Sequence, residues 1–182
     1  MRKKQPEQVK QALEEGAIEI ALSKGLGELT VQSVADAAGV TKGGFMHHFP
    51  SKDALLRAIF DKTLIAIDVE IDKCMAEDEC AYGSFSRAYI AATFNYTEKV
   101  VSDGYALISI LTLGNYGLGQ LWNSWYSKRL ERHSETDSAQ WLAIARYAAD
   151  GVWLSAAVNL SIKDFPDLYE RLISLTRPTV SL

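Results

Sequence analysis

Apolar residues recur at steps of three and four along most of the 182-residue chain, which is the spacing of amphipathic helices. The first such stretch runs from about residue 6 to about 24 and ends at Gly25 and Gly27. No run of alternating β-branched residues interrupts the pattern, so it predicts an all-α protein. Further helices are expected at about 31–38, 42–48, 51–75, 82–101, 103–113, 118–133, 137–161 and 165–175.

The segment between the first helix and the long fourth one is rich in helix starts and stops. Thr30 and Thr41 are N-cap candidates for two short helices, and Ser51 is one for the long helix. Gly39 separates the two short helices, and Pro50 ends the second. Two short helices joined by a tight turn have the form of a helix-turn-helix, whose second helix lies in the major groove of DNA.

The residue types of the second short helix suit that role. Its first residue is a lysine, which can reach base edges, and two glycines follow, so the backbone can approach a nucleic acid closely. Two adjacent histidines and a later lysine can donate to phosphates. Phe45 and Phe49, four residues apart, would hold the helix against the core. The candidate DNA contacts are Thr30, Thr41, Lys42, Gly43, Gly44, His47, His48 and Lys52.

Two other interpretations of this segment fit less well. Neighbouring residues of a helix point about 100° apart, so His47 and His48 do not converge on one metal ion, and we expect no metal site. A phosphate loop would need a preceding strand and a following Gly-Lys-Ser/Thr, which are missing. Each residue alone would equally suit a solvated surface, and it is their order and spacing that favour DNA binding.

Charge and cysteine content narrow the class of protein. The net charge is −4, but residues 1–62 hold 9 Lys and Arg against 8 Asp and Glu, so a local basic surface is compatible with an acidic whole. Cys74 and Cys80 are not part of a Cys/His cluster that could bind zinc, and we expect both to be reduced thiols. Neither a signal peptide nor a stretch of about 18 apolar residues is present, and we expect a cytoplasmic protein without a membrane span.

Residues 29–56, LTVQSVADAAGVTKGGFMHHFPSKDALL, resemble the tetracycline-repressor (TetR) family of bacterial regulators. The shared pattern is a Thr-capped helix, A-x-x-A-G-V-[ST], a short helix ending in [YH]-x-F, and x-[SN]-K-x-x-L. The resemblance implies a three-helix DNA-binding domain over residues 1–50 and a helical ligand-binding and dimerisation domain over 51–182, with no cofactor. Members usually have a tyrosine that touches DNA where this chain has Met46, which could contact a thymine methyl or turn inward.

The expected helix over 137–161 is apolar on nearly all sides and must therefore be covered on both faces. The resemblance implies that it pairs, with the last helix, against the same helices of a second copy. The alternative left open is that both helices are ordinary core of one chain. The predicted dimer residues are Tyr147, Gly151, Leu154, Val158, Leu168 and Leu172.

The middle of the chain is rich in aromatic residues with polar tips, and family members often hold an apolar inducer pocket there. Aromatic residues at helical spacing also form plain core, so this assignment rests on the resemblance. A small apolar or aromatic ligand is expected. The predicted pocket residues are Phe94, Asn95, Tyr96, Tyr116, Trp122, Trp125 and Trp153.

These observations predict a homodimeric transcriptional repressor that binds a palindromic DNA operator and is released by a small inducer. A ligand that binds better when the two recognition helices are wrongly spaced must weaken DNA binding. It does so by the same factor by which DNA weakens the binding of the ligand. No acid–base pair and no nucleophile with its base stand at a spacing typical of a catalytic site, so we expect that the protein is not an enzyme. We interpret the acidic run over 68–79 as a solvated face. The alternatives are a helical protein-interaction module and a regulator without a small ligand.

Overall fold

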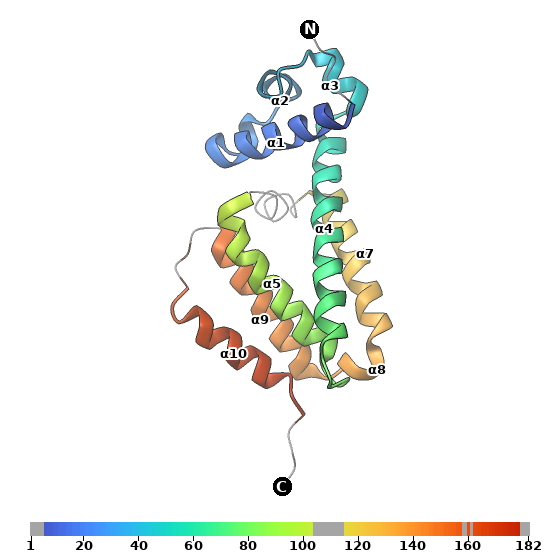
Figure 1. The fold of residues 1–182 in the computed structure, drawn as a ribbon, viewed down its shortest axis with the longest axis vertical. Helices are drawn as coiled ribbons and strands as arrows, with labels where there is room; N and C mark the ends of the chain where they lie inside the picture. Colours follow the sequence, from blue (N-terminus) through green and yellow to red (C-terminus); the bar gives the residue numbers. More distant parts are fainter. Residues whose placement is uncertain (1–5, 104–114, 158–159, 161, 179–182) are drawn as a thin grey trace.

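The computed structural model describes residues 6–103, 115–157, 160 and 162–178, and over these residues it contains helices and no strand (Figure 1). The predicted all-α fold is confirmed, while the helix expected at 103–113 lies almost wholly outside the described residues. No described helix is both long and apolar enough to cross a membrane. The elements are α1 Pro6–Lys24, η1 Leu26–Glu28, α2 Val31–Ala37, α3 Lys42–His48, α4 Lys52–Ala76, α5 Ser84–Asp103, α7 Tyr116–Arg132, α8 Ser134–Asp137, α9 Gln140–Ala157 and α10 Phe165–Leu175.

The first three α-helices form a small unit at one end of the molecule, the upper end in Figure 1. Helix α1 packs against α2, and α2 packs against α3. Leu13, Ala17, Val34 and Phe45 have no exposed surface and form the centre of this unit. The apolar positions predicted from helical spacing therefore do face one another.

Helix α4 has 25 residues and connects this unit to the rest of the chain, as Figure 1 shows. Its first half contributes Leu55, Ile59 and Phe60 to the core of the N-terminal unit, and its second half contributes Ile67 and Ile71 to a separate core with α5 and α7. Because the N-terminal core continues into α4, a division of the chain after residue 50 stays a prediction.

The remaining helices form a bundle in which α5 lies between α4 and α9. Helix α10 covers α9 and α5, and α7 runs along α4. Arg129 of α7 is almost fully buried and donates to the carboxylates of Asp68 and Asp72 on α4, both at 2.6 Å. Two residues of the acidic run thus join helices, which corrects the prediction that the whole run is a solvated face.

Helices α5, α7 and α9 begin two or three residues away from the positions that the spacing predicted, α5 at Ser84 in place of residue 82. Helix α9 begins at Gln140, and Asp137 instead ends the short helix α8, where its side chain accepts hydrogen bonds from the backbone N–H (2.8 Å) and hydroxyl (2.6 Å) of Ser86. Helix α7 begins at Tyr116, two residues early, because the Asn115 side chain caps it.

Candidate functional site

Local hydrogen bonds shape the turn between α2 and α3. Gly39 has a φ of 67°, a left-handed conformation that suits glycine. The Val40 N–H donates to the Ala35 carbonyl (2.9 Å), which closes the end of α2. Thr30 and Thr41 accept from the backbone N–H groups three residues on, both at 3.0 Å, and so cap α2 and α3 as the sequence predicts.

Helix α3 is held down by two aromatic rings and is open on the other side. Phe45 is fully buried and Phe49 is 3% exposed, with ring centroids 6.0 Å apart. The opposite face projects from the end of the molecule farthest from the C-terminus (Figure 1). An amphipathic helix of seven residues with a bare outer face at a tip of the protein is well placed to enter a groove.

The structure brings most of the predicted DNA contacts onto this exposed surface. Met46 is 45% exposed, so it points outward, which decides between the two positions predicted for it. Gly44 and His48 are only half-exposed, and a Cβ on Gly44 would lie 3.3 Å from Val40. The exposed members of the set are Thr30, Thr41, Lys42, Gly43, Met46, His47 and Lys52.

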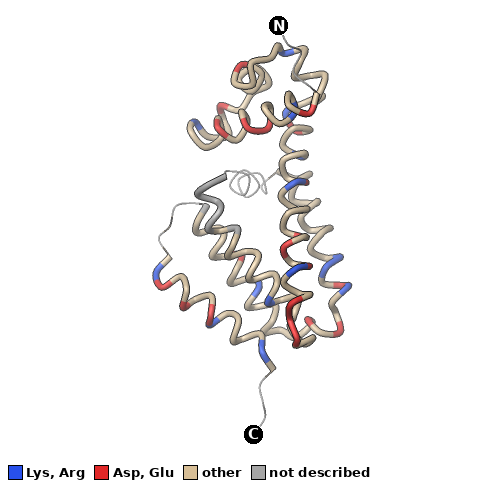
Figure 2. The backbone as a smooth tube through the Cα atoms, in the orientation of Figure 1, with Lys and Arg blue, Asp and Glu red and all other residues tan. Residues whose placement is uncertain are grey.

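Charge is mixed over this end of the molecule. Figure 2 shows acidic and basic positions interspersed along the described helices of the N-terminal unit. Binding to DNA through this surface would therefore depend on a few placed groups more than on a broad positive potential.

An ion pair between a buried carboxylate and a half-exposed lysine joins the N-terminal unit to α4. Glu14 of α1 is fully buried, and Lys62 of α4 donates to it. A buried carboxylate is costly unless it is paired, so this contact specifies how α1 sits on α4. The apolar pattern did not predict this contact, although an acidic residue between Leu13 and Ala17 on an apolar face is a visible signal.

Aromatic side chains from three helices meet beside the second half of α4. Trp122, Trp125 and Tyr126 come from α7, Tyr89 from α5 and Trp153 from α9. The centroid of Trp122 lies 5.0 Å from that of Trp125 and 5.6 Å from that of Trp153. We call these five residues the aromatic cluster. It encloses a small hollow of about 10 Å³ that is lined by Ile67, Tyr89, Thr93, Trp122 and Trp153.

The cluster includes three of the predicted pocket residues and leaves out three others. The side chain of Phe94 lies on a different side of α5 from Tyr89. It packs on Phe165 and Tyr169 of α10, with ring centroids 4.8 and 5.3 Å away. Asn95 is exposed and donates to Glu70 (3.1 Å). Tyr116 is 82% exposed at the first turn of α7. Consecutive helical residues face different neighbours, which is why these positions diverge. The side chain of Tyr96 lies outside the described residues.

Two charged residues of α9 lie next to the aromatic cluster, Arg146 buried and Asp150 partly buried. Arg146 is 3% exposed and donates to the Tyr126 hydroxyl (3.1 Å) and to the Ser86 hydroxyl. Asp150 accepts from the Tyr89 hydroxyl. Burial raises the pKa of Asp150 to about 6, although the hydrogen bond from Tyr89 and the charge of Arg146 oppose the change. Burial and then the Asp150 carboxylate raise the pKa of Tyr89 well above its usual value.

These charged residues were missed by the sequence analysis. An arginine and an aspartate four residues apart in a helix that is apolar on nearly all sides were the available signal.

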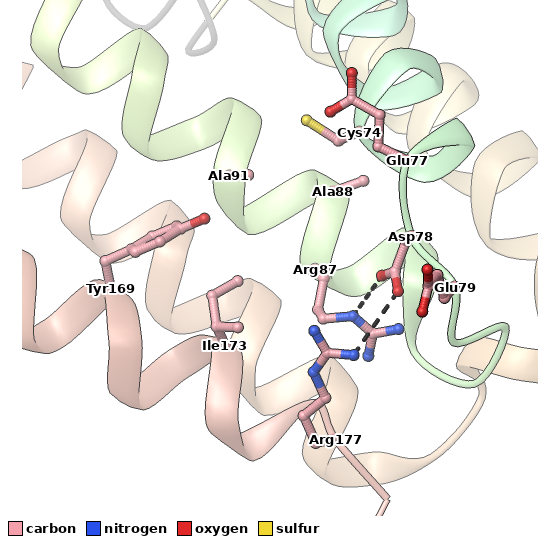
Figure 3. A pocket seen from close by; sticks show the side chains of 10 residues that line it. All are labelled: Cys74, Glu77, Asp78, Glu79, Arg87, Ala88, Ala91, Tyr169, Ile173 and Arg177. Carbon is pink, nitrogen blue, oxygen red and sulfur yellow. Dashed lines mark hydrogen bonds and ion pairs between the residues drawn. The ribbon is translucent and has the colours of Figure 1, made fainter.

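A second hollow of about 380 Å³ lies at the lower end of the bundle between α4, α5 and α10 (Figure 3). Arg87, which is 5% exposed, donates to Asp78 (2.6 Å), and the Arg177 guanidinium lies 3.8 Å from the same carboxylate. Burial disfavours the Asp78 anion, but these partners outweigh it and lower its pKa. The polar groups of this hollow mainly satisfy one another and close the end of the bundle.

One face of α9 carries large apolar side chains that no described residue covers. Trp141, Ile144, Tyr147 and Leu154 are between 53% and 63% exposed and follow one another at helical spacing, with Gly151 exposed among them. This apolar stripe includes three of the predicted dimer residues.

Two further predicted dimer residues lie against the core, and a third is not among the described residues. Leu172 is 5% exposed in the core between α5, α9 and α10, so it supports the surface from beneath and is not part of it. Leu168 is half-buried against the same core. Val158 lies outside the described residues.

Comparison with known proteins gives two family matches that together span most of the chain. Residues 14–59 match the family model described as bacterial regulatory proteins of the tetR family. Residues 83–177, just over half of the chain, match the model described as the tetracyclin repressor-like C-terminal domain.

Solved structures share the fold at low sequence identity. The multidrug binding protein EbrR complexed with malachite green is 16% identical, with a TM-score of 0.72 over 93% of this chain and 98% of that one. The fatty acid degradation regulator FadR from Bacillus halodurans is 18% identical, with a TM-score of 0.67 over 96% of both chains. The superantigen PfiT is also 18% identical, with a TM-score of 0.63 over 94% of this chain and 97% of that one. The different names show that this fold alone does not define a function.

Proposed function

The chain belongs to the tetracycline-repressor family of bacterial regulatory proteins, and on this basis we propose that it is a homodimeric repressor, released from its DNA operator by a small molecule. The observation that carries the proposal is the exposed face of α3, set on two buried rings at the tip of the molecule. Its DNA partner would place it in the cytoplasm. Residues 1–50 serve as the DNA-binding domain and residues 51–182 as the ligand-binding and dimerisation domain.

In this proposal α3 lies in the major groove. Lys42 reaches a base edge or phosphate from the first turn, and Gly43 lets the backbone approach the DNA. Met46 contacts a thymine methyl, since its side chain is outward. His47 and Lys52 donate to phosphates, which fixes the helix in the groove. Thr30 and Thr41, the N-caps of α2 and α3, are the remaining DNA contacts in this proposal.

The apolar stripe of α9 provides the dimer contact. Exposed tryptophan, isoleucine, tyrosine and leucine side chains on one helix are costly in water and are typical of an interface. A two-fold dimer through α9 presents two copies of α3, which accounts for a palindromic operator with two half-sites.

The ligand binds in the aromatic cluster and acts through α4. Ile67 of α4 lines the hollow there, and the Trp125 indole N–H donates to Asp68 of α4 (2.7 Å). A molecule that enlarges the hollow therefore displaces α4, and with it the attached N-terminal unit. Among solved structures of this fold, EbrR has been seen with a dye bound, which supports a ligand for this chain.

The test is a fluorescence-anisotropy titration against DNA from upstream of the protein's own gene, at several salt concentrations and beside a scrambled duplex. Lys42→Ala should weaken specific binding by about tenfold or more and reduce its salt dependence. Lys163→Ala, an exposed lysine far from α3, is the matched control and should leave binding unchanged. Equal weak binding to both duplexes, followed by an empty selection from genomic fragments, would favour a protein-interaction module instead.

A further inference from the structure

One polar group in the aromatic cluster lacks a partner. Trp153 is 6% exposed and lines the hollow, and its indole nitrogen Nε1 is buried without a hydrogen-bond partner among the described residues. Trp125, in the same cluster, does satisfy its indole nitrogen, through Asp68. Buried donors are nearly always paired, so an unpaired one beside a hollow indicates an acceptor supplied from outside the chain.

The charges next to the cluster do not balance. Arg146 is engaged with Tyr126 and Ser86, and its guanidinium lies 4.0 Å from Asp137, which is 2% exposed. That arginine and Asp137 offset each other. Asp150 accepts a hydrogen bond only from a neutral group, the Tyr89 hydroxyl, and forms no ion pair among the described residues, although the charge of Arg146 partly stabilises its anion. A largely buried carboxylate without a cation is unfavourable and is stabilised by any positive group brought to it.

We propose that the aromatic cluster binds an aromatic organic cation that carries a hydrogen-bond acceptor, with Asp150 as its counter-ion and Trp153 Nε1 donating to its acceptor. Indole and phenol faces attract cations, and the five rings provide such faces on several sides. The proposal rests on the proposed function, because it names the ligand class of that same regulator. It adds that charge, and not apolarity alone, selects the ligand.

The hollow of about 10 Å³ has room for no organic molecule as it stands. The ligand therefore takes the place of a ring. Trp122 is the ring best able to move, since it is only partly buried and lies on α7 at the outside of the bundle. Its displacement would press on the α4 side of the hollow, where Ile67 lies.

The proposal is tested by isothermal titration calorimetry of the full-length protein with three probes of one size: naphthylethylammonium, naphthylethanol and naphthylacetate. The cation should bind about tenfold or more tightly than the neutral alcohol and the anion. Asp150→Asn should abolish this preference, since its amide still accepts from Tyr89 but carries no charge. Asp167→Asn, an exposed aspartate on α10, should retain it. Equal affinity for the cation and the alcohol, or no binding of any probe, overturns the proposal.

Trp153 is tested with a fourth probe, the methoxy derivative of the cation, whose ether oxygen is an acceptor. It should bind the unaltered protein more tightly than the parent cation, and Trp153→Phe, which keeps a ring but lacks the N–H, should lose that gain. An unchanged gain in this variant removes Trp153 from the proposal. The DNA titration without any probe separates the two conclusions: specific DNA binding together with no selection for the cation refutes the ligand class alone.

Discussion

The variant Asp150→Asn also tests a quantitative prediction about how the free energy of unfolding depends on pH. The pKa of Asp150 is about 6 in the folded chain, against an ordinary value of 3.8. That difference corresponds to about 3 kcal/mol of stability. Because the folded state holds the proton more tightly than the unfolded state, the carboxyl group opposes folding once it ionises. Its unfavourable contribution is absent well below pH 4 and grows as the pH rises through 6.

The asparagine variant has no such proton to lose, so its advantage over the unaltered protein should grow with pH. The linkage relation gives about 1 kcal/mol of this contribution at pH 4.5 and about 3 kcal/mol at pH 7.5. The difference of about 2 kcal/mol corresponds to a Tm change of about 4–8 °C for a chain of this size.

The assay is thermal unfolding followed by circular dichroism at both pH values and at one protein concentration, because association shifts the Tm. Asp167→Asn, whose carboxylate is exposed, should show the same Tm difference from the unaltered protein at both pH values. A gain for Asp150→Asn that is equal at pH 4.5 and 7.5 would refute the reasoning, since it would mean that Asp150 is not destabilised by its charge in the folded state.

Two further variants test the closure of the bundle and the apolar stripe. Gly83→Ala should lower the free energy of unfolding by about 2 kcal/mol, measured by urea titration, because Gly83 has a φ of 72° and its new Cβ would lie 2.5 Å from the Thr176 carbonyl. Gly27→Ala, which meets nothing within 4 Å, should cost much less, and equal losses would contradict this account. Leu154→Glu should convert a dimer to a monomer in light scattering, because it places a charge in an apolar interface. Leu22→Glu, equally exposed on α1, should leave the mass unchanged; if Leu154→Glu does the same, the stripe is not the interface.

The N-terminal unit was largely predictable because its signals are local. A cap, its acceptor and the helix it starts lie within three residues, as for Thr30 and Thr41, and the single turn glycine Gly39 has the positive φ that the pattern required. Phe45 and Phe49 share one face of a short helix, so their burial follows from spacing alone. No knowledge of distant contacts was needed.

The C-terminal part was less predictable because its contacts join residues far apart in sequence. Tyr89 and Phe94 are both aromatic residues of α5, but one faces α7 and the other faces α10. Composition does not distinguish these two faces. Asp137, the last residue of α8, accepts from the backbone N–H of Ser86 in the first turn of α5, 51 residues earlier, and periodicity cannot reveal such a partnership. The spacing of Leu172 along its helix is compatible both with an exposed interface and with the core. Only the position of α5 shows that this side chain belongs to the core.

The length of α4 sets the size of any movement at the DNA. Its 25 residues extend over about 37 Å at the usual helical rise, from the neighbourhood of Glu77 to the residues beneath α3. A tilt of only about 5° about the lower end would move the upper end by about 3 Å, close to the height of one base pair. In a dimer the two displacements combine, so the distance between recognition helices would change by about two base pairs. A helix of half the length would require twice the tilt, and therefore a much larger rearrangement of the packed bundle, to achieve the same mismatch.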